Sequence, residues 1–106
     1  MITYEDFRKL ELKVAQIKEV FEIEGATKLY RLIIDVGDKQ KQIIAGIKQY
    51  YRPEDLVGKQ IVIVDNLEPA VIRGIESQGM LLAASDGENL AIISPQKEIK
   101  PGSLVK

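Results

Sequence analysis

Apolar and polar residues alternate over much of the chain with a period of two, which is the pattern of a strand buried on one face. Near the N-terminus, Leu10, Leu12 and Val14 alternate with charged residues, but Ile17 then falls in the opposite phase. A β-bulge near residues 15–16 explains this slip. Small closed barrels use such a bend to turn a corner in a long first strand.

The clearest alternation predicts a second strand with Tyr30, Leu32, Ile34 and Val36 on its inward face. The pair Gly37-Asp38 predicts a hairpin turn after it. Further strands are predicted from apolar runs bounded by turn residues, at 43–45, 60–65, 80–84 and 90–94. The run QIVIVD at 60–65 is apolar in both phases, which predicts burial on both sides.

Two short helices are expected between these strands. Thr3 is a suitable N-cap for a helix over 4–10, with Asp6 as a weaker capping-box partner. Pro53 and Gly58 fit the first turn and the end of a second helix, between the third and fourth strands. This order predicts an all-β chain, a five-stranded Greek-key barrel of the OB-fold type with a C-terminal extension. At 106 residues the chain, residues 1–106, is expected to be a single domain.

The composition argues against catalysis and against metal binding. The chain has no cysteine and no histidine, so disulfides, zinc–thiolate sites and the commonest general base are excluded. Carboxylates such as Asp35 and Asp65 remain, but nothing pairs them at a recognisable spacing. We therefore expect no catalytic residue, no metal and no cofactor.

The N-terminal residues lack the pattern of a signal peptide, and no apolar run approaches the roughly 20 residues of a membrane span. A cytoplasmic location without membrane association is the resulting expectation.

Charge is unevenly distributed although the net charge is only −1. Residues 26–52 hold six basic and two acidic side chains, and the flanking parts are acidic. From charge alone, a solvated hairpin with chance clustering is the simpler explanation of this block, and an RNA-binding surface is the alternative.

The stretch between the predicted strands at 60–65 and 80–84 is richer in chemistry than a connector requires. Arg73 lies between an apolar residue and a glycine, and Asn66, Ser77 and Gln78 offer groups that pair with base edges. Met80 offers a polarizable apolar surface. Taken individually, each residue has a simpler structural explanation: a strand-end cap for Asn66, a turn for Ser77 and the core for Met80.

Together these residues form a recognisable pattern. The stretch NLEPAVIRGIESQGMLLAA resembles the signature of the tRNA-binding domain family, which includes the C-terminal region of methionyl-tRNA synthetases and free-standing tRNA-binding proteins. The stretches DFRKLELKVAQIKEV, GATKLYRLIIDVG and QIIAGIKQYYRPEDLVGK follow the same family in order. The resemblance is closest to the methionyl type, including its free-standing β-subunit form, and an excised domain would look the same.

The resemblance implies a set of RNA-binding positions on an OB-fold face. Those matched here are Lys28, Arg31, Lys41, Asn66, Arg73, Ser77 and Met80. Placing Arg73, Lys28 and Ser77 on the surface, we expect substitutions there to change binding and not stability. One position departs from the family, because Val71 stands where lysine is frequent.

The resemblance further implies a non-catalytic module that binds tRNA by shape and backbone contacts and supports a synthetase, methionyl by type, in trans or within one chain. It implies a homodimer as well. A bacterial branch of the family resembles a dimeric, secretion-related chaperone that binds peptides, and that alternative stays open.

Overall fold

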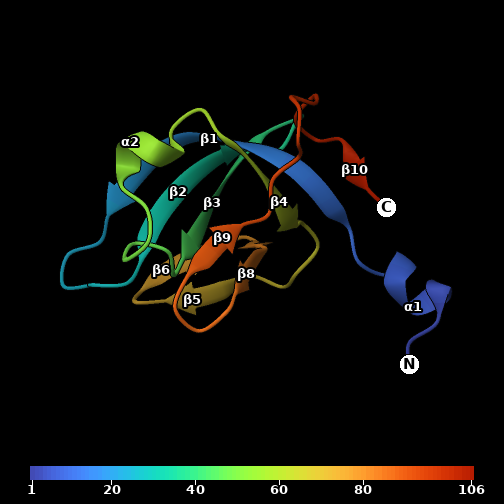
Figure 1. Cartoon of the computed structure of the whole chain (residues 1–106), viewed down its shortest axis with the longest axis horizontal. Coiled ribbons are helices and arrows are strands. Elements are labelled where there is room, and N and C mark those ends of the chain that lie inside the picture. The colour runs from blue at the N-terminus through green and yellow to red at the C-terminus, as the bar shows by residue number, and fades with distance from the viewer.

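The computed structural model describes all 106 residues and contains two short helices and ten strands (Figure 1). The helices are α1 (Tyr4–Arg8) and α2 (Pro53–Leu56). The strands are β1 (Leu12–Glu22), β2 (Tyr30–Asp35), β3 (Gln40–Ala45), β4 (Gln60–Val64), β5 (Ala70–Ile72), β6 (Ile75–Ser77), β7 (Met80–Leu81), β8 (Ala83–Ser85), β9 (Leu90–Ile92) and β10 (Leu104–Val105).

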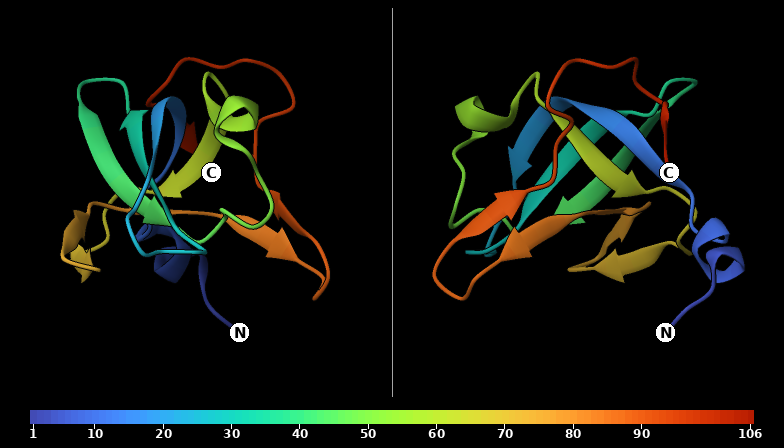
Figure 2. Two further views of the ribbon diagram at one scale, coloured as in Figure 1. Left: turned by 90° about the vertical axis from the view of Figure 1, so that its left-hand side faces the viewer. Right: turned by 45° about the vertical axis from the view of Figure 1, so that its right-hand side comes forward.

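One antiparallel sheet dominates, with strand order β3-β2-β1-β4-β7. The long strand β1 serves two neighbours, because its first half pairs with β4 and its second half pairs with β2. The sheet therefore curls into a half-barrel (Figure 2). The prediction of an all-β chain with a small barrel and two short helices is confirmed, and α2 lies between β3 and β4 as expected. The C-terminal segment returns along the sheet, where β10 pairs with the start of β1.

The bulge lies later than predicted. The register between β1 and β2 shifts between Ile17 and Glu19, so Lys18 is the unpaired residue. Ala15 and Ile17 are both completely buried, which keeps the inward alternation intact through residues 15–17. The extra residue is placed where a lysine side chain can extend into solvent.

The core lies inside the curl and consists mainly of aliphatic side chains from β1 to β4. Leu32 and Ile34 of β2 face Ile43 of β3, and all three are completely buried. Residues 61–64 are all buried, which confirms the prediction from QIVIVD. Below the curl, the separate hairpin β8–β9 adds Leu90 and Ile92 to the core edge (Figure 1).

Helix α1 has the predicted capping box, in which Oγ1 of Thr3 accepts a hydrogen bond from the Asp6 amide at 3.1 Å. The prediction of residues 4–10 is too long by two residues, because the helix ends at Arg8. Asn66 supplies the reason. Its side chain donates to the carbonyl of Lys9 at 2.7 Å and accepts from the amide of Glu11 at 2.9 Å, which fixes the bend of the chain between α1 and β1.

The strand boundaries after residue 65 were predicted wrongly in two places. The stretch 66–79, taken as a connecting loop, contains the hairpin β5–β6. The strand expected at 80–84 is divided into β7, which joins the main sheet, and β8, which pairs with β9. Strands of two or three residues carry too few alternations for a periodic signal.

Candidate nucleic-acid interface

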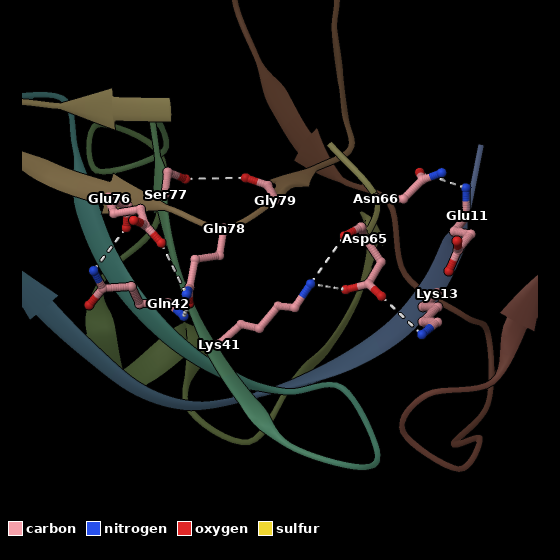
Figure 3. A network of polar contacts seen from close by, with 10 residues as sticks. All are labelled: Glu11, Lys13, Lys41, Gln42, Asp65, Asn66, Glu76, Ser77, Gln78 and Gly79. Atoms are coloured by element: carbon pink, nitrogen blue, oxygen red, sulfur yellow. Dashed lines mark hydrogen bonds and ion pairs between the residues drawn. The ribbon is translucent and has the colours of Figure 1, made fainter. Parts of the chain in front are cut away.

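Ser77 and Gln78 join the two open sides of the half-barrel. The amide of Ile44 on β3 donates to Oγ of Ser77 at 2.9 Å. The amide of Gln42 donates to Oε1 of Gln78 at 3.0 Å, and the amide of Gln78 donates to the carbonyl of Gln42 at 2.9 Å. These bonds replace part of the ladder that a regular strand would form between β3 and β7 (Figure 3).

Ser77 is therefore not a surface residue, and the expectation that it lies there is wrong. It is the only buried polar residue of the chain, with 4% of its surface exposed. Its hydroxyl accepts from Ile44 and donates to the carbonyl of Gly79 at 3.2 Å. Both hydrogen-bonding functions are used inside the protein, so Ser77 builds the barrel wall.

Asn66 is also committed to the fold. Both ends of its amide bind the segment between α1 and β1, and the bond to Glu11 is drawn in Figure 3. The side chain has a structural role, as the sequence allowed, although it does not cap the end of its own strand.

Lys41 is held by an ion pair. Its ammonium lies 2.7 Å from one carboxylate oxygen of Asp65, and Lys13 lies 2.9 Å from the other (Figure 3). Burial alone would raise the pKa of the Asp65 carboxyl, but hydrogen bonds from Lys41 and Lys13 outweigh it and hold the pKa below its ordinary value. The hydrogen bond to Asp65 in turn raises the pKa of Lys13.

Arg31 lies on the outer face of the sheet, since both neighbours in β2 are buried. Its guanidinium stacks over the ring of Phe21 on the adjacent strand β1, 4.3 Å from the centroid. It also donates a long hydrogen bond of 3.4 Å to Oε1 of Gln42, and it makes no ion pair. The side chain is thus fixed in place while its charge stays uncompensated by any carboxylate.

Arg73 occupies the first position of the two-residue turn between β5 and β6. Its φ of 51° and the φ of 79° at Gly74 correspond to the left-handed region required of both residues in a type I′ turn. Arg73 is the only non-glycine residue of the chain in this region. Asparagine, aspartate and glycine are the residues favoured there, so arginine is held at an energetic cost.

The Arg73 side chain extends toward the loop between β1 and β2. A Cβ on Gly25 of that loop would lie 2.9 Å from a terminal nitrogen of Arg73, so the guanidinium lies directly against the loop backbone. The same loop carries Lys28, which is exposed and makes no ion pair. The β1–β2 loop and the β5–β6 turn thus bring two cations from distant parts of the sequence to one end of the molecule.

The seven predicted site residues therefore separate into groups. Lys28, Arg31 and Arg73 are the unpaired cations at the end where β1 leads into β2, and we call these three the cationic corner. Lys41 lies toward the other end of β3. Arg31 pairs with Ile44 of β3, and Lys41 is three residues from Ile44, so the Lys41 side chain faces the other side of the sheet. Met80, on β7, is 49% exposed.

The sequence interpretation missed Phe21 and Gln42. Phe21 follows Val20, which packs on the core, so alternation alone placed Phe21 outside. An aromatic residue that faces outward on a strand was the available signal. Nothing in the sequence predicted that the Gln78 side chain would replace backbone hydrogen bonds to β3, because this depends on a side chain reaching a strand that is distant in sequence.

No cluster of three or more carboxylate, imidazole or thiol groups that could hold a metal ion is present. Neither helix has the length and apolarity needed to cross a bilayer.

Comparison with known proteins places this geometry in a family. Residues 12–104 match the family described as "Putative tRNA binding domain". The chain belongs to this tRNA-binding domain family. The domain is 50% identical over 105 residues to a methionine–tRNA ligase from Pyrococcus horikoshii and 52% identical to one from Methanococcus aeolicus. Each match covers 99% of this chain but only 14% and 16% of those proteins, so the domain corresponds to a small part of the curated relatives.

Solved structures of similar domains cover nearly the whole of both chains. A MetRS-related protein from Pyrococcus horikoshii matches with a TM-score of 0.94 at 34% identity, covering 100% of this chain and 98% of that one. The chaperone CsaA from Bacillus anthracis matches with a TM-score of 0.92 at 31% identity, covering 100% and 99%. The tRNA-binding domain fold thus occurs in proteins with two different functional descriptions.

Proposed function

We propose that this domain is a non-catalytic tRNA-binding module that supports an aminoacyl-tRNA synthetase, methionyl by its relatives, either in trans or as part of the same chain. The observation that carries the proposal is the cationic corner, in which Lys28, Arg31 and Arg73 lie at one end of the sheet and none of them has an ion-pair partner. In this proposal the RNA binds at the loops along the rim of the curled sheet, as oligonucleotides do in OB-folds.

Local charge, and not net charge, favours RNA at this corner. Three other cations of the sheet and its loops are neutralised, Lys13 and Lys41 by Asp65 and Lys48 by Glu22 at 2.6 Å. Arginine and lysine that lack such partners are free to displace counterions from phosphates. The strained backbone of Arg73 also supports RNA binding at this corner, because residues in unfavourable backbone conformations cluster at functional sites.

The remaining predicted positions act differently in this proposal. Ser77 and Asn66 shape the barrel and its rim, and Lys41 is held by Asp65, so none of the three is needed as a direct contact. Met80 is exposed beside Asn66 and Asp65 and offers an apolar surface to a ribose or base edge. Phosphate contacts carry no sequence information, so recognition depends on the shape of the folded RNA.

Filter binding at several salt concentrations tests the proposal. Several unrelated tRNAs should bind with similar affinity, and a linear RNA of the same length should bind more weakly. The affinity should fall steeply as salt rises. Equal binding of tRNA and linear RNA, or no binding of tRNA at low salt, would remove the proposal.

The proposal includes a homodimer in the cytoplasm. Helix α1 buries no residue and projects from the body of the protein (Figure 1), with Ile2 73% and Tyr4 71% exposed. Leu104 of the C-terminal strand β10 is 64% exposed. Apolar termini of this kind are suited to pairing with a second copy, which would double the RNA contacts. Light scattering should give twice 11.9 kDa at micromolar concentration, and a monomer at all concentrations would exclude the dimer.

Peptide binding is a second candidate function, favoured by Val71 and Met80, which are 74% and 49% exposed. These residues give the domain an apolar surface near the barrel rim, and structural neighbours include the chaperone CsaA. An unfolded peptide that competes with tRNA for the domain would support a shared surface. An absence of peptide binding at concentrations well above those for tRNA would exclude this function.

A further inference from the structure

We infer that Phe21 and Arg31 form a stacking site for one unpaired nucleobase on the outer face of β1 and β2. The inference rests on the proposed function and specifies it further, because it assigns to Arg31 a contact with a base where a phosphate contact would otherwise be assumed. It also adds Phe21, which belongs to none of the predicted site positions.

The pair is already assembled in the free protein. Phe21 and Arg31 are direct partners in the β1–β2 register, and the guanidinium lies 4.3 Å from the ring centroid. Gln42 fixes the outer end of Arg31 by accepting its hydrogen bond at 3.4 Å. Gln42 is itself held, since its side-chain amide donates to the carbonyl of Glu76 at 2.8 Å (Figure 3). Little conformational freedom remains to be lost when a planar ligand stacks on this surface.

The chemistry of the pair favours a base over a phosphate alone. Single-stranded bases stack on aromatic rings and on the planes of arginine guanidinium groups. Phe21 retains 37% of its surface exposed, although a neighbouring arginine covers part of the ring. A lysine in place of Arg31 would supply the same charge for a phosphate but no planar surface.

The positive charge around the pair favours a base that belongs to RNA. Arg73, at the tip of the β5–β6 hairpin, and Lys28, in the β1–β2 loop, supply unpaired positive charge at the same end of the sheet. Backbone phosphates flanking a stacked base would meet these cations. Arg31 itself has no carboxylate partner, so its charge is available to the ligand.

An exposed apolar residue away from the cationic corner provides the control. Ile99 is 42% exposed, and its backbone amide donates to the side chain of Gln60, at the start of β4, at 3.0 Å. The variant Ile99→Ala removes apolar surface, as Phe21→Leu does, without touching the proposed stacking site.

The experiment combines tRNA filter binding with the fluorescence of 2-aminopurine in a short single-stranded RNA. Stacking of the probe quenches its emission. Wild-type protein and Ile99→Ala should quench it, and Phe21→Leu should not. Phe21→Leu should bind tRNA on the order of 5- to 100-fold more weakly, with the slope of log affinity against log salt unchanged. Arg31→Lys should also keep the slope and lose affinity, and thermal melting should show that each variant is folded.

The outcomes separate the two proposals. If wild-type protein binds tRNA while Phe21→Leu and Arg31→Lys bind it equally well, Arg31 contacts phosphate only and the stacking site is wrong, although the tRNA-binding function stands. If the probe is quenched in a Phe21-dependent way but tRNA does not bind, the stacking site stands and the tRNA-binding function falls. If neither RNA binds, both are wrong.

Discussion

The backbone amide of Ile44, in strand β3, donates its hydrogen bond to the side chain of Ser77 and not to a neighbouring strand. The hydroxyl oxygen is 2.9 Å from this amide, and the hydroxyl donates a hydrogen bond to the carbonyl of Gly79 at 3.2 Å. One buried serine thus links β3 to the chain that enters β7, at the side of the half-barrel that the main ladder leaves open. The residue is part of the scaffold that positions the rim.

Ser77→Ala should therefore destabilise the protein, because the buried amide of Ile44 would lose its acceptor. The expected loss is about 1–3 kcal/mol in the free energy of unfolding. Urea titration of the variant measures it. The exposed Ser85, whose hydroxyl accepts only from the Gly87 amide at 3.3 Å, provides the control variant Ser85→Ala. Equal stability of the two variants would show that the barrel does not depend on Ser77.

Arg73→Asn should raise stability and weaken RNA binding in the same molecule. Asparagine tolerates the left-handed backbone at φ 51° better than arginine, so a gain on the order of 1 kcal/mol is expected. Loss of the guanidinium should lower tRNA affinity. Arg73→Lys, which keeps both the charge and the unfavourable backbone, should leave stability and the salt slope unchanged. A loss of stability in Arg73→Asn would mean that the side chain supports the fold through its position against Gly25.

Asp65→Asn should destabilise the protein at neutral pH by about 1–3 kcal/mol, because Lys13 and Lys41 would lose a shared carboxylate. The pKa of Asp65 is lowered in the folded state, so its contribution is present above the ordinary value of 3.8 and disappears as pH falls through the folded pKa. The stability difference between wild type and variant should therefore shrink below about pH 4. Asp38→Asn, at an exposed turn without an ion pair, provides the control variant. A stability difference for Asp65→Asn that stays constant with pH would contradict the ion-pair account.

Asn66→Ala should loosen the segment between α1 and β1 without unfolding the barrel. The amide of Glu11 would lose its acceptor, and the carbonyl of Lys9 would lose its donor. Hydrogen exchange at the Glu11 amide should accelerate, while exchange in β1 and β4 should stay slow. Asn89, exposed in the turn between β8 and β9 and distant from Glu11, offers the control variant Asn89→Ala. Unchanged protection of the Glu11 amide from hydrogen exchange would show that the Asn66 side chain does not hold this segment.

The sequence predicted the main sheet well because its strands are long enough to show alternation. Tyr30, Leu32 and Ile34 face inward as expected, and the prediction that 60–65 is buried on both sides held through Val64. The bulge was misplaced by about two residues, since Lys18 looks like an ordinary outward residue in a pattern of alternation. The hairpin β5–β6 was missed because each of its strands has only three residues.

The candidate site was predicted less completely, for a physical reason. Sequence pattern identifies which side chains carry useful chemistry, but not which of them the protein has already used. Ser77, Asn66 and Lys41 carry suitable groups, and in the fold each is engaged by a backbone or carboxylate partner. Lys28 and Arg73 remain free, and Phe21 becomes relevant only because the register places it opposite Arg31.

The most direct test of the cationic corner is the salt dependence of tRNA affinity for the double variant Lys28→Ala/Arg73→Ala. Its matched control is Lys39→Ala/Lys100→Ala, which removes two exposed lysines near the opposite end of the sheet, where Val36 and Gly37 contact the C-terminal turn. The corner variant should lower the slope of log affinity against log salt by roughly 1.4–1.8, the scale of two released counterions, while the control leaves it unchanged. If both double variants lower the slope equally, or neither does, tRNA is not bound at this corner.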